Sequence, residues 1–206
     1  MPINETKRRY DVENIPFNED LEKFAPPYTP EKFSDEEVEY LTPFFSNIDR
    51  PVFVAMNLPE EVIGALSSRY SRTELSLRRL FLKEYVGPIV APDEQPGWDK
   101  LNDEEKTEAF ELRGKFVDWI NFFHENGGID AVVNTQRARG FFSRWLAGYG
   151  DESIAEMGTA HVLLEGISNI ATNEIEDKRI AISPIEKSSR YVSFAERRPD
   201  GEYQYI

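Results

Sequence analysis

The sequence contains no cysteine. This absence excludes disulfide bonds, thiolate nucleophiles and zinc sites built on thiolates. Histidine is almost absent as well. The only two, His124 and His161, lie far apart in the sequence. Metal motifs that need two histidines within one or two helical turns are therefore excluded, and no metal is expected.

Long hydrophobic runs are missing too. No stretch approaches the ~18 apolar residues that a transmembrane helix requires. The N-terminal segment MPINETKRRYDVENIPF lacks the apolar core of a signal peptide. We therefore expect no membrane partner and a cytoplasmic location.

Positive charge is scarce. The chain has 24 lysines and arginines against 38 aspartates and glutamates, which gives a formal net charge of −14. Binding to a nucleic-acid backbone needs a dense cationic face, so no nucleic-acid partner is expected. A local cationic pocket on an acidic protein can still attract a small anion.

Proline-rich stretches suggest how the 206 residues are divided. We expect an extended N-terminal arm over 1–33, because several prolines punctuate a polar segment there. A helical region should cover 34–86, followed by a linker over 87–101. A second helical region is expected over 102–206, and it packs either alone or as one domain with the first.

Apolar residues at spacings of three and four predict helices in both regions. Ser34 with Glu37, and Asn102 with Glu105, have the spacing of a capping box at a helix start. The helix that starts at Asn102 is predicted to end at the Gly127-Gly128 pair.

Two shorter helices are predicted after Pro59 and after Thr73. A long buried helix is predicted near the C-terminal end, through Ile154, Met157, His161, Leu164, Ser168, Ala171 and Ile175. The segment HVLLEGI inside it would also suit a strand. The fold class predicted is mainly helical, or α+β with a small sheet.

A cationic cluster, KRIAISPIEKSSRY from Lys178 to Tyr191, stands out in this acidic chain. Its lysine, arginine and serine side chains could bind a phosphate group. The same charges could instead cap a helix end and pair with nearby glutamates. Both interpretations stay open on the residues alone.

The stretch from Gly150 to Tyr191 resembles the flavin-dependent thymidylate synthases. Their motif RHRxxSxNExSxRY is preceded by a segment of the form GHxSxxEH. Here GDESIAEM stands in the place of GHxSxxEH, and SPIEKSSRY in the place of SxNExSxRY. The resemblance implies nucleotide-binding roles for Ser183, Glu186, Ser188 and Arg190.

The resemblance also implies FAD-binding roles for Ser153, Glu156, Lys178 and Arg179. It assigns no catalytic residue. The sequence departs from the family at the Arg-His-Arg group, where one arginine is lost, and at two upstream histidines, which are replaced by Asp151 and Met157.

The activity implied is the methylation of dUMP to dTMP. Methylenetetrahydrofolate would supply the carbon, reduced FAD the hydride, and NAD(P)H would reduce the flavin. The resemblance further implies a homo-oligomer with a shared active site, and we expect the chain to be an N-terminal part of a longer, divergent family member. The alternative is a non-catalytic helical nucleotide-binding or assembly module derived from that family.

A second cluster of arginines lies between Ser67 and Phe81, at Arg69, Arg72, Arg78 and Arg79. These side chains could bind an anion near a helix N-terminus, or they could form salt bridges and an interface. The segment TELSLRR shares the order of Glu, Ser and Arg with IEKSSRY, so an internal duplication is an open possibility.

Overall fold

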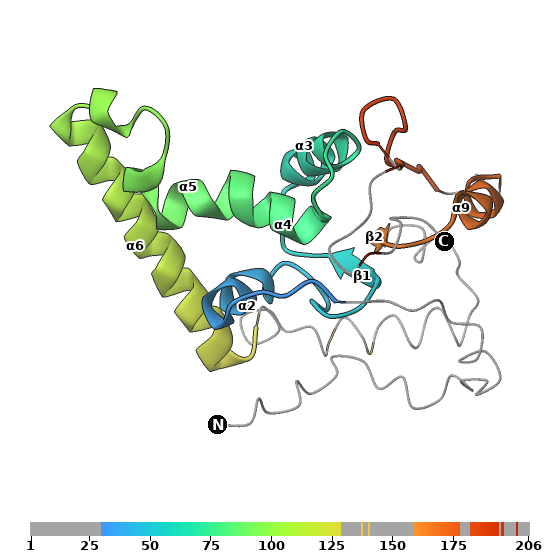
Figure 1. Ribbon diagram of the computed structural model, residues 1–206. Coiled ribbons are helices and arrows are strands. Elements are labelled where there is room, and N and C mark those ends of the chain that lie inside the picture. The colour runs from blue at the N-terminus through green and yellow to red at the C-terminus, as the bar shows by residue number, and fades with distance from the viewer. Residues whose placement is uncertain are drawn as a thin grey trace.

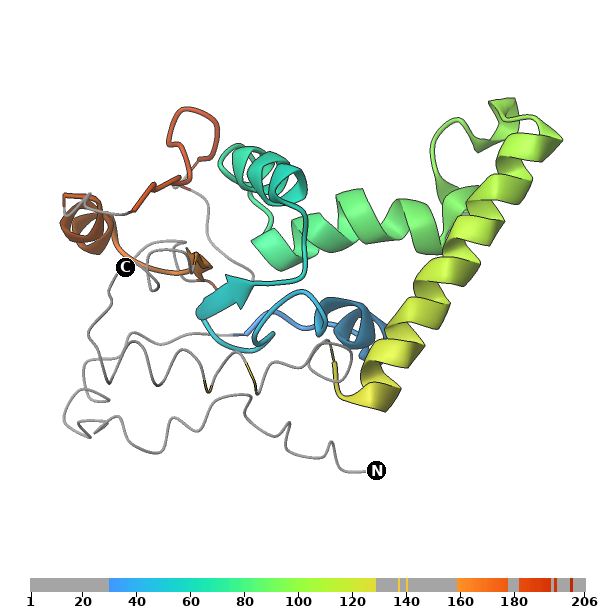
Figure 2. The same cartoon turned by 180° about the vertical axis from the view of Figure 1, so that it is seen from behind.

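The computed structural model describes residues 30–128, 137, 140, 159–177, 182–193, 195 and 201. Helices surround a small two-stranded sheet, as Figure 1 shows from the front and Figure 2 from behind. In chain order the described elements are α2 (Asp35–Leu41), β1 (Val52–Ala55), α3 (Glu60–Tyr70), α4 (Leu77–Phe81), the π-helical turn η1 (Leu82–Val86), α5 (Gly87–Val90), the 3₁₀ turns η2 (Pro92–Glu94) and η3 (Trp98–Lys100), α6 (Asp103–Asn126), β2 (His161–Leu164) and α9 (Asn169–Glu176). The predicted fold class, mainly helical with a small sheet, is confirmed.

The two capping boxes are both present. Ser34 Oγ accepts a hydrogen bond from the Glu37 N–H, and the Glu37 side chain accepts one from the Ser34 N–H. The same reciprocal pair joins Asn102 and Glu105 at the start of α6. Gly127 ends α6 with a φ of 75°, a left-handed conformation that glycine adopts without a steric penalty.

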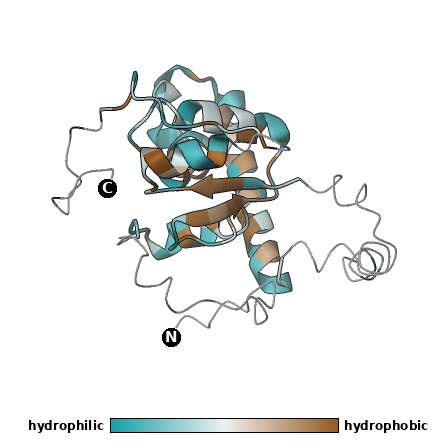
Figure 3. Cartoon of the chain, turned by 90° about the vertical axis from the view of Figure 1, so that its right-hand side faces the viewer, coloured by the Kyte–Doolittle hydropathy of each residue, from teal (hydrophilic) through white to brown (hydrophobic). Residues whose placement is uncertain are grey.

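The sheet joins segments that lie more than 100 residues apart. β1 and β2 are antiparallel, with Val52 opposite Leu164 and Ala55 opposite His161. One face of β1 is buried, since Phe53 is 1% exposed. In Figure 3 the strands are hydrophobic and lie in the middle of the described part, with more hydrophilic helix surface outside them.

The prediction of one long helix through His161 and Leu164 is wrong, because residues 161–164 form β2. Pairing with β1 outweighs the helical spacing of the apolar residues there. Gly166, with a φ of 69°, then turns the chain. The Ser168 side chain accepts from the Ala171 N–H and so begins α9 as a separate helix.

The core centres on α4 and η1, which continue directly into α5. Phe45 lies between two other rings, because it packs edge-on against Phe53 at 82° and against Phe81 at 87°. Edge-to-face packing places the positive rim of one ring on the negative face of another.

The expected division into an arm, two helical regions and a linker stays a prediction, although α5 occupies the first four residues of the expected linker. Within the described residues, no helix combines the length and the hydrophobicity needed to cross a membrane.

Arg78 is the largest of the fully buried side chains and is 1% exposed. Its guanidinium lies 3.7 Å from the centre of the Phe53 ring. Its two terminal nitrogens donate to the carbonyls of Ile48, at 2.7 Å, and Arg50, at 2.6 Å. Arg78 thus ties the turn before β1 to α4.

The substitution Arg78→Met should lower the free energy of unfolding by about 2–5 kcal/mol, because it keeps most of the buried side-chain volume but removes both partly buried hydrogen bonds to the Ile48 and Arg50 carbonyls. Urea denaturation followed by circular dichroism measures this change. The matched control is Arg69→Met on the exposed end of α3, which should change stability little. Equal stability of the wild type and Arg78→Met would contradict this role.

Candidate functional site

The predicted nucleotide segment forms a tight turn that is bound to the end of α3. The Ser188 N–H donates to the Ser71 carbonyl at 3.0 Å. The Ser188 carbonyl accepts from the N–H groups of Tyr191 and Val192, both at 3.0 Å, and Ser188 Oγ accepts from the Arg190 N–H at 3.3 Å. Val192 is 2% exposed. The turn is therefore held at both ends, while the side chains of Arg190 and Tyr191 are exposed.

Lys187, immediately before this turn, makes a second connection to the same region. Its Nζ donates to the carbonyls of Leu75, at 2.9 Å, and Glu74, at 3.2 Å. It also lies 4.4 Å from the centre of the Tyr70 ring, a favourable cation–π distance. Lys187 is not among the site residues predicted from the sequence, although its place inside the motif EKSSRY is a signal for it.

Glu165 reaches the start of α4 from the end of β2. Its Oε1 accepts from the Leu77 N–H at 3.2 Å. Burial raises the pKa of this carboxyl above its ordinary value, and the Arg78 guanidinium, the Leu77 N–H and Lys187 partly offset that rise. Burial also lowers the pKa of Lys187, partly offset by Glu165 and Glu74. Glu165 is not among the predicted site residues either, because its burial arises only in the folded chain.

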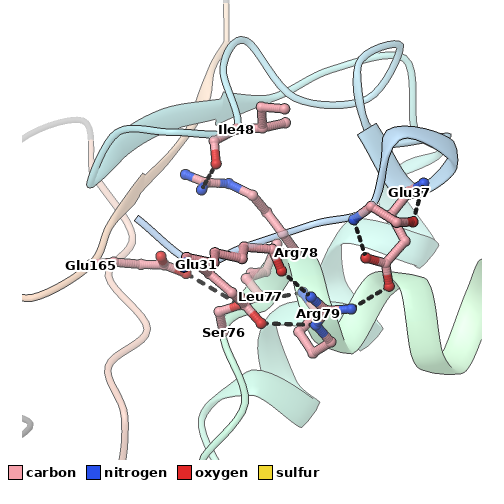
Figure 4. A network of polar contacts seen from close by, with 10 residues as sticks. Glu31, Glu37, Ile48, Ser76, Leu77, Arg78, Arg79 and Glu165 are labelled. Carbon is pink, nitrogen blue, oxygen red and sulfur yellow. Dashed lines mark hydrogen bonds and ion pairs between the residues drawn. The ribbon is translucent and has the colours of Figure 1, made fainter. Parts of the chain in front are cut away.

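The segment between α3 and α4 is thus the meeting point of three distant parts of the chain. Figure 4 shows Glu165 directed toward Leu77, and Glu31 beside it reaching Ser76 and Arg79. Arg79 Nε donates to Glu31 at 2.8 Å, and Arg79 Nη1 also forms an ion pair with Glu37. Glu165 thereby satisfies the Leu77 N–H, which has no helical partner at the start of α4, whereas the contacts of Glu31 and Arg79 join side chains.

The four arginines of the second cluster have different surroundings. The salt-bridge interpretation is confirmed for Arg69, which binds Glu84 at 2.7 Å, and for Arg79. Arg78 instead binds the two carbonyls named above. Arg72 lies over the Tyr191 ring, 5.4 Å from its centre, and so joins the predicted nucleotide segment.

The structure brings together two of the eight site residues that the resemblance implies, Ser188 and Arg190. Ser183 and Glu186 are exposed in the segment before them, which has no regular secondary structure. The four predicted FAD-binding residues lie outside the described part of the chain: Ser153, Glu156, Lys178 and Arg179.

The two histidines have structural contacts. His161 Nε2 lies 3.2 Å from Glu60, and His124 Nε2 lies 3.0 Å from the Glu39 carbonyl. Across the part of the chain that the structure describes, no group of three or more His, Asp or Glu side chains could hold a metal ion. The Ser188 turn itself offers cations and hydroxyls, which suit an anion.

Comparison with known proteins identifies the family. Residues 103–205, half of the chain, match the model of the family described as thymidylate synthase complementing protein. The chain belongs to this family. The match covers α6, β2, α9 and the Ser188 turn, while α3 and α4 lie before it.

The chain is also similar to curated proteins named UPF0159 protein. The relative from Chlamydia muridarum (strain MoPn / Nigg) is 38% identical over 173 residues, which cover 84% of this chain and 27% of that protein. The relative from Chlamydia pneumoniae is 36% identical over 175 residues, or 85% of this chain and 27% of that protein. A third, from Thermoplasma acidophilum, is 44% identical over 73 residues, or 35% of this chain and 14% of that protein.

The chain therefore spans about a quarter of the length of the two chlamydial relatives. No solved structure matches the chain significantly. The family description refers to thymidylate synthase, while the printed name of the relatives states no activity.

The raised pKa of Glu165 predicts a specific pH dependence. A group whose pKa is higher in the folded state stabilises fully below the ordinary glutamate pKa, and this contribution is lost as the pH rises through the folded pKa. The variant Glu165→Gln cannot ionise and keeps an oxygen for the Leu77 N–H. Its free energy of unfolding relative to wild type should therefore increase between pH 4 and pH 7, as urea titrations at both values would show.

The matched control is Glu111→Gln, which removes an exposed carboxylate in the middle of α6. Measured in the same way, it corrects for the effect of removing one negative charge from the surface. If the difference for Glu165→Gln stays constant or falls with pH, the buried carboxyl is not destabilised by ionisation.

Proposed function

We propose that this chain takes part in the flavin-dependent methylation of dUMP to dTMP, and that the turn from Ser188 to Val192 holds the phosphate of dUMP. Family membership and the geometry of this turn support the proposal. The observation that carries it is that Ser188 and Val192 anchor the turn, while Arg190 is exposed.

In this proposal Arg190 forms two parallel hydrogen bonds to phosphate oxygens, which the planar guanidinium allows. Ser188 Oγ already accepts a hydrogen bond from the Arg190 N–H at 3.3 Å. The backbone from which the Arg190 side chain extends is therefore held in place before a ligand binds. Ser183 and Glu186, exposed in the preceding segment, would contact the rest of the nucleotide. A site ordered in advance loses less entropy on binding.

The donors of the described site fit a phosphate group, a feature that dUMP and FAD share. Methylenetetrahydrofolate would supply the carbon, and FAD, reduced by NAD(P)H, the hydride. Ser153, Glu156, Lys178 and Arg179 would hold the flavin. The described residues act by neutralising the nucleotide phosphate and fixing its position.

We also propose that the chain forms a homo-oligomer. One face of the sheet carries exposed apolar side chains, because Val52 is 49% exposed and Val162 is 55% exposed. Both point to the same side, since Val162 lies opposite Val54 in the register. An apolar face of this kind is stabilised by contact with a second protein surface.

The second candidate function is a non-catalytic nucleotide-binding or assembly module. The changes at the Arg-His-Arg group, with Asp151 and Met157 in place of histidines, favour it. A module of this kind would keep the Ser188 turn and bind nucleotide without flavin chemistry.

Purified protein distinguishes these two candidates. The enzyme should bind FAD and show a flavin absorbance spectrum, either as purified or after titration with FAD. Protein that stays colourless and binds no FAD, yet binds dUMP, is the module. If FAD binds, release of the C5 hydrogen of dUMP in the presence of NADPH and methylenetetrahydrofolate measures the reaction.

The substitution Arg190→Ala should weaken dUMP binding about 10- to 100-fold, the loss expected for a charge-assisted hydrogen bond. Isothermal titration calorimetry with the 206-residue chain measures it. Arg69→Ala is the matched control, because Arg69 is also exposed but already binds Glu84. Unchanged dUMP affinity in Arg190→Ala would remove this residue from the phosphate site.

A further inference from the structure

The tetrapeptide Ser-Ser-Arg-Tyr occurs twice in the sequence, at 67–70 and at 188–191. The structure places the two copies next to each other. The Ser188 N–H of the second copy donates to the carbonyl of Ser71, the residue that follows the first copy. Figures 1 and 2 both show the segment 182–193 beside α3.

Each tyrosine of the two copies contacts a cation from the other segment. Lys187, just before the second copy, lies 4.4 Å from the centre of the Tyr70 ring. Arg72, just after the first copy, lies 5.4 Å from the centre of the Tyr191 ring. The reciprocal contacts hold Arg72 beside the residue that follows Arg190.

Arg72 differs from its neighbour Arg69 in its partners. Arg69 forms an ion pair with Glu84. Toward the described residues, Arg72 donates through Nη1, to the Ser68 carbonyl at 2.7 Å, to Ser68 Oγ at 2.8 Å and to Ser71 Oγ at 3.4 Å. No carboxylate in the described ranges pairs with Arg72, and the same holds for Arg190.

Among the residues that the structure describes, these two guanidinium groups are exposed and have no carboxylate partner, in a chain of net charge −14. Two cations on adjoining segments repel each other, and an anion bound between them reverses that repulsion. A phosphate monoester suits such a pair, because it carries close to two negative charges and three acceptor oxygens at neutral pH. Each guanidinium can donate two hydrogen bonds to it.

We infer that Arg72 is a second phosphate-binding residue, and that it acts with Arg190 on the same phosphate group of a nucleoside monophosphate. The inference rests on the proposed function, because it takes dUMP as the ligand of the Ser188 turn. Arg72 lies outside residues 103–205, so the site needs the α3–α4 turn as well as the part of the chain that matches the family model.

Titration calorimetry on the full 206-residue chain tests this assignment with dUMP, with deoxyuridine, which lacks the phosphate, and with inorganic phosphate. The variant Arg72→Gln should lose about 10- to 100-fold in affinity for dUMP and for inorganic phosphate, and keep its affinity for deoxyuridine. Arg72→Lys keeps a cation over Tyr191 and should lose less. The matched control, Arg69→Gln, should bind all three ligands as the wild type does.

The outcomes separate the two proposals. If the wild type binds neither dUMP nor inorganic phosphate, both are overturned. If it binds dUMP and Arg72→Gln binds dUMP equally well, only the role of Arg72 is overturned. A parallel loss of dUMP and deoxyuridine affinity would also overturn it, because Arg72 would then support the turn through Tyr191 without touching the phosphate.

Discussion

The rest of the structure depends on backbone groups of the turn between α3 and α4 that have no helical hydrogen-bond partner. Helical hydrogen bonds do not reach the carbonyls of Ser71, Glu74 and Leu75 or the N–H of Leu77, and each buried polar group needs a partner. The partners come from Ser188, Lys187 and Glu165. A local requirement for hydrogen bonds therefore fixes where two distant segments lie.

The same turn shows how the surroundings of a side chain decide its role. Arg78 is buried and binds carbonyls, while Arg79 is half-buried and binds carboxylates. Arg69 is exposed and bound to Glu84, and Arg72 is exposed beside Tyr191. Four arginines within eleven positions thus have four different roles. Arg78 stabilises the core and Arg79 the start of α4, while Arg69 forms a surface ion pair and Arg72 belongs to the proposed anion site.

The site combines an acidic protein with a small cationic surface. The excess negative charge opposes broad binding of polyanions, whereas two guanidinium groups on adjoining segments attract a single phosphate at short range. The family relation and this surface point to the same ligand class. Arg72, the second cation, precedes residues 103–205, which match the family model. The α3–α4 turn is therefore part of the proposed site and not only a support for it.

The sequence by itself determined the features that depend on near neighbours. The capping boxes at Ser34 and Asn102, and the end of α6 at Gly127, could be predicted because the interacting groups lie within one helical turn. The motif around Ser188 could also be recognised from the sequence, since it resembles the motif of a known family. Tertiary structure decided the rest. Residues 161–164 became a strand because β1 lies beside them. Arg72 lies beside Tyr191, in the proposed site, because a hydrogen bond across more than 100 residues joins the two segments. Contacts of that separation leave no periodic signal in the sequence.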